Sequence, residues 1–124
     1  MLAENVPAWF EIPTRDLDRA TRFYETLLGA ELIREDTQMG KMAVFPARIP
    51  HVTGSLVQAE GYRPDAQGMV IYLNLREDLT QTLNRVEPAG GKVLMGKTEL
   101  PDDMGFFAQF QDCEGNRVGL FSQT

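Results

Sequence analysis

The feature that most restricts the fold is a pattern that occurs twice in the chain. Residues 9–33, WFEIPTRDLDRATRFYETLLGAELI, have the pattern of a strand, a capped helix and a second strand. A weaker copy, IYLNLREDLTQTLNRVEPAGGKVLM, occupies residues 71–95. Because 124 residues are enough for one compact domain, the two copies predict a single domain built from two similar halves.

The first copy predicts an amphipathic helix between two strands. The run from Trp9 to Ile12 is aromatic and branched, and Pro13 marks its end. Asp16 is expected to be the helix N-cap, and Gly29 the left-handed C-cap. Between the caps, apolar residues recur at the helical period: Leu17, Ala20, Tyr24, Leu27 and Leu28.

The remaining segments complete two equivalent halves. A second helix is expected to begin at Asp78 and to end at Pro88. A shift of 62 residues aligns Asp16 with Asp78, and a shift of 65 aligns Gly54 with Gly119. Further strands are expected at 41–45, 54–59, 69–75, 92–95, 106–111 and 117–121.

Each half is therefore expected to be a βαβββ module. The predicted fold class is α+β, with two βαβββ modules forming an open, cupped, eight-stranded mixed sheet around a cavity. We expect one domain over residues 1–124, with module one at 1–60 and module two at 68–124. The linker at 61–67 is rich in turn-forming residues.

Charge and composition restrict the partners. The net charge is −6 and the 12 Lys and Arg residues are scattered, so we expect no nucleic-acid binding. No apolar run is long enough to span a membrane, and residues 1–8 show no signal-peptide pattern. The single cysteine, Cys113, fits a reducing compartment and is interpreted as a bystander thiol. We therefore expect a cytoplasmic protein without a membrane partner.

Three segments carry a family resemblance that covers nearly the whole chain: residues 10–29, 89–93 and 110–120. They resemble the glyoxalase/bleomycin-resistance/dioxygenase proteins, the vicinal oxygen chelate superfamily. The last segment, FQDCEGNRVGL, is similar to the family's acidic turn D-P-x-G-N, with Cys113 in place of the proline. The resemblance implies paired βαβββ modules and a homodimer whose cavity is built or completed between chains, but this fold supports several unrelated functions.

The resemblance also implies four positions at which metal-dependent relatives carry His or Glu. In this sequence they are Trp9, Gly54, Ile71 and Gly119, and none has a metal-binding side chain. The only histidine, His51, lies in a proline-flanked connection outside those positions. A metal held by Glu11 and water would bind weakly. We therefore expect no cofactor and no divalent metal.

Strand alternation predicts the residues that face the cavity. Glu11 has the parity of Trp9, so its carboxylate is expected to point inward as a general base, a ligand contact or the partner of Arg117. Gln58 can donate a hydrogen bond to a ligand. Gly54 and Gly119 are expected to leave space, which either holds a ligand or is filled as core. The predicted ligand-binding residues are Trp9, Glu11, Gly54, Leu56, Gln58, Ile71, Leu73, Arg117, Gly119 and Phe121.

Four functions compete. The favoured one is a metal-free protein that binds a small, partly apolar, neutral or cationic molecule in a dimeric cavity. The second, a metal-dependent lyase, isomerase or dioxygenase, rests on the resemblance alone. The third is a metal-free enzyme with Glu11 as its catalytic base, and the fourth an interaction module without a small ligand. The sequence does not identify the ligand.

Overall fold

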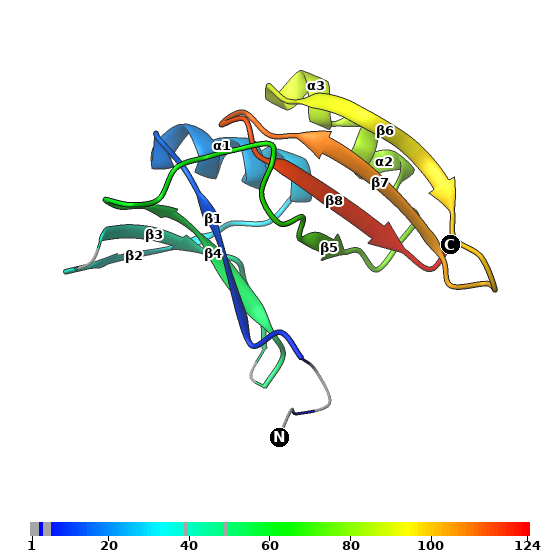
Figure 1. The fold of residues 1–124 in the computed structure, drawn as a ribbon, viewed down its shortest axis with the longest axis horizontal. Coiled ribbons are helices and arrows are strands. Elements are labelled where there is room, and N and C mark those ends of the chain that lie inside the picture. The colour runs from blue at the N-terminus through cyan, green and yellow to red at the C-terminus, as the bar shows by residue number, and fades with distance from the viewer. Residues whose placement is uncertain (1–2, 4–5, 39, 49) are drawn as a thin grey trace.

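The computed structural model describes residues 3, 6–38, 40–48 and 50–124. The chain forms two βαβββ units (Figure 1). The first contains β1 (Trp9–Pro13), α1 (Leu17–Leu28), β2 (Ile33–Thr37), β3 (Gly40–Val44) and β4 (Thr53–Gln58). The second contains β5 (Tyr72–Asn74), α2 (Thr80–Asn84), α3 (Val86–Ala89), β6 (Lys92–Glu99), β7 (Phe106–Gln111) and β8 (Arg117–Ser122).

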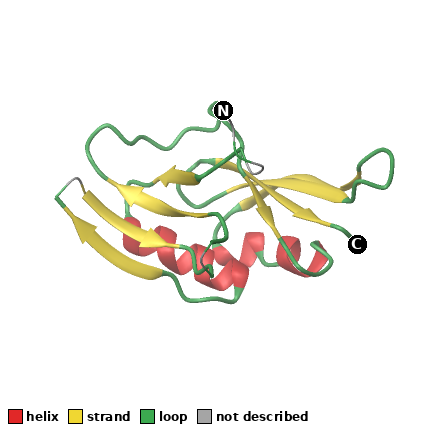
Figure 2. Cartoon of the chain, turned by 90° about the horizontal axis from the view of Figure 1, so that it is seen from below, coloured by secondary structure: helices red, strands yellow, loops and turns green. Residues whose placement is uncertain are grey.

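The two units have the same sheet topology. Their strand orders are β1-β4-β3-β2 and β5-β8-β7-β6. In each unit the first strand runs parallel to the last, and the other pairs are antiparallel. The helices lie together on one side of the strands (Figure 2). The α+β class and the duplication are therefore confirmed, with the eight strands hydrogen-bonded as two sheets of four rather than as one continuous sheet.

Helix α1 has the predicted caps and lies beneath both sheets. Asp16 accepts a hydrogen bond from the backbone N–H of Arg19 at 3.0 Å, and Gly29 is left-handed with φ 65°. Tyr24 of α1 is fully buried, and its ring packs edge-on against Phe45 of the first unit. It also packs against Phe110 of the second unit, so one core joins both halves.

The second helix differs from the prediction because it is broken. Its N-cap is Leu79, which makes no side-chain capping hydrogen bond, rather than the predicted Asp78. Asp78 lies one residue earlier and accepts a hydrogen bond from the backbone N–H of Thr80 at 2.9 Å. The chain then divides into α2 and α3 at Arg85, and the left-handed C-cap is Gly90. Pro88 lies inside α3 rather than ending the helix. Proline is tolerated there because a residue in the first turn of a helix needs no backbone N–H.

The residues that are equivalent in the two units differ by one position from those that the sequence alignment predicted. Ile12 and Leu56 of the first unit face α1, and their counterparts on the buried side of the second unit are Leu73 and Leu120. Gly54 therefore faces the helices, whereas Gly119 faces the open side. Because side chains alternate along a strand, this single-residue difference exchanges the two faces.

No helix in the described part of the chain is both long enough and apolar enough to cross a membrane.

Candidate functional site

The acidic turn at residues 112–116 fixes the second unit against the first. One oxygen of Glu114 accepts hydrogen bonds from the backbone N–H groups of Arg15 and Asp16, at 2.7 and 2.9 Å. Its other oxygen binds the guanidinium of Arg19 at 2.6 Å. Although burial opposes ionisation, Arg19 and the two N–H groups hold the pKa of Glu114 below its ordinary value. This carboxylate therefore joins the turn between β7 and β8 to the start of α1.

Two neighbours of Glu114 complete the connection. Asp112 accepts a hydrogen bond from the buried hydroxyl of Tyr24 at 2.7 Å. Burial, together with the charge of Asp112, raises the pKa of Tyr24 well above its ordinary value. The side-chain amide of Asn116 donates to the carbonyl oxygen of Pro13 at 2.8 Å, which ties the turn to the end of β1. The turn is therefore structural, and it sets the gap between β1 and β8.

A cleft of about 590 Å³ occupies that gap. Trp9 and Glu11 of β1 form one wall, and Met69, Ile71 and Arg117 are on the other side. Trp9 is 43% exposed and Met69 is fully exposed, so the cleft presents apolar surface to solvent. A cleft with apolar walls and a few charged groups is typical of a small-molecule site.

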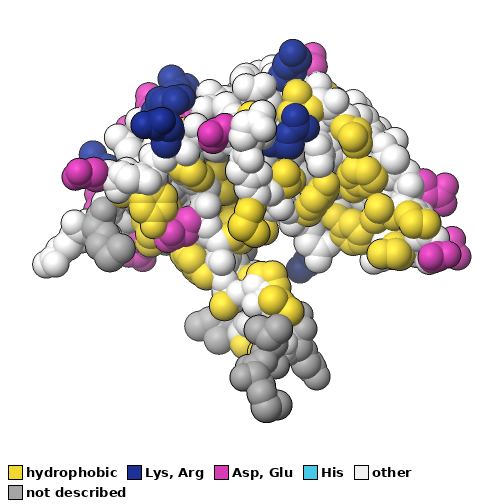
Figure 3. All heavy atoms as spheres, viewed as in Figure 1, with side chains coloured by type: hydrophobic (Ala, Val, Ile, Leu, Met, Phe, Trp, Pro, Cys, Tyr) yellow, Lys and Arg dark blue, Asp and Glu magenta, His cyan; other side chains and the backbone are white. Residues whose placement is uncertain are grey.

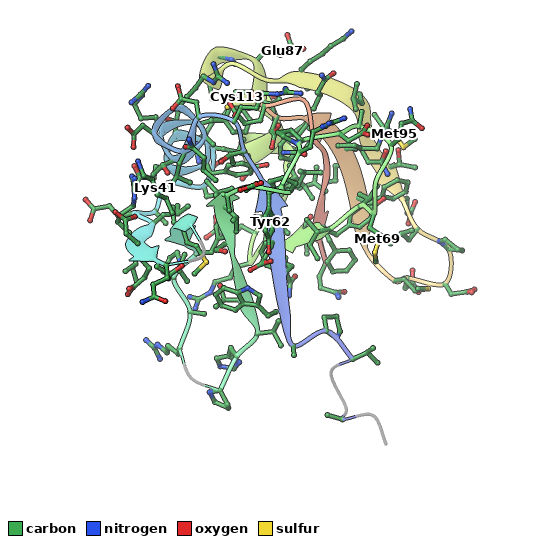
Figure 4. The ribbon with its side chains drawn as sticks, turned by 60° about the vertical axis from the view of Figure 1, so that its left-hand side comes forward. Lys41, Tyr62, Met69, Glu87, Met95 and Cys113 are labelled. Atoms are coloured by element: carbon green, nitrogen blue, oxygen red, sulfur yellow. The ribbon has the colours of Figure 1, made fainter. Side chains whose placement is uncertain are left out.

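Glu11 has one partner on its own strand and one in the connection between the two units. The hydroxyl of Tyr62 donates to one carboxylate oxygen at 2.6 Å, and the indole N–H of Trp9 makes a long contact of 3.4 Å with the other. Figure 4 shows Tyr62 against the strands of the first unit. The hydrogen bond to Glu11 raises the pKa of Tyr62. Glu11 also lines a smaller pocket of about 250 Å³ beside Met42 and Val57.

Arg117 binds within the second unit. Its guanidinium donates to the side-chain carbonyl oxygen of Gln109 at 2.9 Å. Among the described residues, four ion pairs are present, and none includes Glu11 or Arg117. The Glu11–Arg117 alternative from the sequence is therefore wrong, because Glu11 binds Tyr62 in the connection after β4, and Arg117 binds Gln109 on its own sheet. Both charges remain on the cleft.

Several predicted cavity residues lie on the helix side instead. Leu56 is fully buried in the core, and Leu73 is buried there as well. The side-chain oxygen of Gln58 accepts a hydrogen bond from the backbone N–H of Leu17 at 2.9 Å, so Gln58 serves the start of α1. The expected inward orientation of Leu56, Leu73 and Gln58 is corrected, because the alternation was assigned one residue out of register.

Gly54 and Gly119 each have an aromatic ring packed against them rather than empty space. A Cβ at Gly54 would overlap Phe10, and a Cβ at Gly119 would overlap the ring of Tyr72. The space expected from these glycines is therefore filled by side chains of the neighbouring strand. Gly119 still faces the open side, with Phe121 two residues further along β8.

A third hollow, of about 440 Å³, lies on the open side of the second unit. Its walls are Tyr72, Asn74, Leu100, Phe107 and Phe121, and of these only Phe121 was predicted as a site residue. Figure 3 shows hydrophobic side chains gathered over this part of the molecule. Sequence reasoning missed Tyr72 because it assigned the inward face of β5 to Ile71 and Leu73. It missed Tyr62 because that residue lies in a segment with turn chemistry.

The four positions that correspond to the expected metal ligands do not fit a metal. With the corrected register, Trp9 of the first unit corresponds to Val70 of the second, and Ser55 corresponds to Gly119. None of these side chains is an imidazole, carboxylate or thiolate. Over residues 3, 6–38, 40–48 and 50–124, no three His, Cys, Asp or Glu side chains form a group that could hold an ion. His51 lies in an exposed loop after β3.

A family model and several solved structures match most of this chain. A family model described as Glyoxalase/Bleomycin resistance protein/Dioxygenase superfamily matches residues 7–120. A search of curated proteins gives no match. Among solved structures, a hypothetical protein from S. aureus is 25% identical with a TM-score of 0.67, over 92% of this chain and 94% of that chain.

Two further solved structures show the same fold. An antibiotic binding protein from Streptomyces sp. CB03234 is 21% identical with a TM-score of 0.70, over 100% of both chains. Glyoxalase I from Zea mays is 22% identical with a TM-score of 0.66, over 94% of this chain but 45% of that chain. The present chain therefore spans less than half the length of the Zea mays protein.

Proposed function

The chain belongs to the glyoxalase/bleomycin resistance protein/dioxygenase superfamily, and from this premise we propose that it binds a small, partly apolar molecule without a metal. The observation that carries the proposal is the cleft of about 590 Å³, which is lined by apolar side chains and by four charged residues, Glu11, Arg63, Asp65 and Arg117, no two of which form an ion pair. The antibiotic binding protein of similar fold supports a binding role over a structural one.

The chemistry of the cleft favours a neutral or cationic aromatic ligand. The carboxylate of Glu11 can accept a hydrogen bond from an ammonium group, and the exposed indole of Trp9 offers a face for a cation. The net charge of −6 also attracts cations to the surface. Arg117, on the opposite side of the cleft, can bind an oxygen of the same ligand.

The proposal includes a homodimer in the cytoplasm. Large apolar side chains are exposed on strands of both units, including Ile33 and Met95. A second copy would cover part of this surface and close the cleft from solvent. The lone thiol of Cys113 is compatible with a reducing compartment. Sedimentation velocity at about 10 μM tests the assembly, and a purely monomeric boundary would remove the dimer from the proposal.

Calorimetric titration with proflavine, a flat aromatic cation, tests the binding function. We expect saturable binding, and chromatography of the dye afterwards should recover it unchanged. Glu11→Gln should weaken binding by about tenfold or more, because a hydrogen bond to a charged group contributes about 1.5–3 kcal/mol. The matched control is Glu87→Gln, whose side chain lies at the far end of the molecule (Figure 4).

Two outcomes would contradict the proposal. Absence of saturable heat would contradict a binding cleft for this class of compound. Steady consumption of the dye would show turnover, and its loss in Glu11→Gln would favour the metal-free enzyme in which Glu11 is the base.

A further inference from the structure

The proposed binding function can be refined at one residue that lies outside the central cleft. We propose that Tyr72 is a specificity-determining residue that donates a hydrogen bond to an acceptor oxygen of a neutral, flat aromatic ligand. The site is the hollow of about 440 Å³ on the open side of the second unit. This inference rests on the binding function above and specifies the class of ligand.

Three side chains on adjacent strands form a hydrogen-bonded chain. Arg117 of β8 donates to the carbonyl oxygen of the Gln109 side chain at 2.9 Å. The amide nitrogen of the same Gln109 then lies 2.6 Å from the hydroxyl of Tyr72 on β5. Gln109 of β7 pairs with Gly119 across the ladder, and Tyr72 pairs with Gly119 from the other side. The bare backbone at 119 therefore allows the two side chains to meet above it.

The direction of the hydrogen bonds that join Arg117, Gln109 and Tyr72 follows from the chemistry of Arg117. A guanidinium has only donors, so the Gln109 atom that it contacts must be the carbonyl oxygen. The other end of Gln109 is consequently the NH₂ group, which donates to the hydroxyl oxygen of Tyr72. The single hydroxyl hydrogen of Tyr72 cannot point back at this donor. It is directed away from Gln109, and Tyr72 is 40% exposed.

The surroundings of the hydroxyl select a neutral aromatic compound. The ring of Tyr72 lies edge-on to Phe107, with centroids 6.1 Å apart. Phe121 is the ladder partner of Phe107, so three rings stand on one side of the sheet. None of the other four lining residues carries a charge. Rings favour a flat aromatic ligand, and an outward O–H favours a carbonyl oxygen on it.

A matched pair of compounds tests the inference. Xanthone carries a ring carbonyl, and xanthene has the same tricyclic frame with a methylene in its place. We expect the wild-type protein to bind xanthone about threefold to tenfold more tightly, the usual net effect of one neutral hydrogen bond. Tyr72→Phe keeps the ring and should abolish the preference, while leaving the affinity for xanthene unchanged.

A second variant tests the direction of these hydrogen bonds. In Gln109→Glu the carboxylate accepts from both Arg117 and Tyr72, so the tyrosine hydrogen turns away from the ligand. The preference for xanthone should disappear, although every aromatic ring and the Tyr72 hydroxyl remain. A purely structural role for Gln109 would instead lower both affinities together. Circular dichroism melting curves identify any variant that fails to fold, and Tyr72→Phe then provides the comparison.

The outcomes separate this inference from the binding function. Equal affinities of the wild-type protein for the two compounds would overturn the donor role of Tyr72, as would a xanthone preference that survives in Gln109→Glu. Failure of both compounds to bind would overturn the ligand class. The binding function is judged separately, by the proflavine titration at the Glu11 cleft.

Discussion

The ring of Tyr72 lies directly over Gly119, its partner in the parallel pair of β5 and β8. The first unit contains the same arrangement between Phe10 and Gly54, but on the side of the sheet that faces the helices. In both units the glycine has no Cβ, and this leaves room for the aromatic ring of the neighbouring strand. In the second unit that ring carries the hydroxyl that we assign to ligand selection.

Gly119→Ala should destabilise the protein by about 1–3 kcal/mol, the usual cost of overpacking, because the added methyl group displaces the ring of Tyr72. The control is Gly96→Ala in β6, where a Cβ would meet no atom within 4 Å. That change should alter stability by less than about 0.5 kcal/mol. Urea unfolding of both variants provides the comparison. Equal effects would mean that Tyr72 does not rest on Gly119.

Glu114→Gln should reduce stability by about 2 kcal/mol at pH 7, because an amide cannot pair with Arg19 as the carboxylate does. The pKa of Glu114 is lowered in the folded state from its ordinary 4.5. Its contribution is therefore fully present above pH 4.5 and declines as the pH falls through the lower folded value. Wild-type and variant unfolding free energies should converge in acid.

The control for Glu114 is Asp36→Asn. Asp36 pairs with Arg34 at 3.0 Å, but its side chain is 61% exposed, so the loss of stability at pH 7 should be small. A Glu114 effect as small as that of Asp36 would contradict the role of the acidic turn in joining the two units.

The sequence predicted the topology because the signals for it are local. Asp16 and Gly29 mark the ends of α1 through contacts within a few residues. The faces of the strands could not be obtained in the same way. Alternation specifies that Leu56 and Gly54 share a face, but only packing against α1 determines which face it is. For β5, the alignment hides the correct face because the step from Leu73 to Asp78 is one residue longer than the step from Ile12 to Asp16.

The candidate site was predicted less well because its contacts are distant in sequence. Tyr62 reaches Glu11 across 51 residues, from a segment that local rules assign only to turns. Tyr72 reaches Gln109 across 37 residues. Trp9, Glu11 and Arg117 were placed on the central cleft, because the parity of β1 and β8 was assigned correctly.

Cys113 should react slowly with iodoacetamide. Burial, together with the carboxylates of Glu114 and Asp112, raises the pKa of this thiol to about 12. At pH 8 the thiolate fraction is about a thousandfold lower than for a thiol with a pKa of 9, and the greater nucleophilicity of the thiolate recovers part of this. We expect a rate about 50-fold below that of N-acetylcysteine. The rate should increase through pH 10, whereas a plateau near pH 9 would contradict the raised pKa.

Asp78 should titrate with a midpoint near pH 2. The backbone N–H of Thr80, followed by Lys97 and the hydroxyl of Thr80, lowers the pKa of Asp78 from 3.8 to about 2. Its contribution to stability is therefore complete above pH 3.8 and is lost as the pH falls through about 2. Carbon-13 chemical shifts of the carboxyl group measure the midpoint. Lys97→Met should raise the midpoint only partly toward 3.8, because the hydrogen bonds from Thr80 remain. Methionine can still pack on Phe106, where the Lys97 ammonium lies 4.4 Å from the ring centroid. A midpoint at 3.8 in the wild-type protein would show that Asp78 does not accept the hydrogen bonds from Thr80 and Lys97.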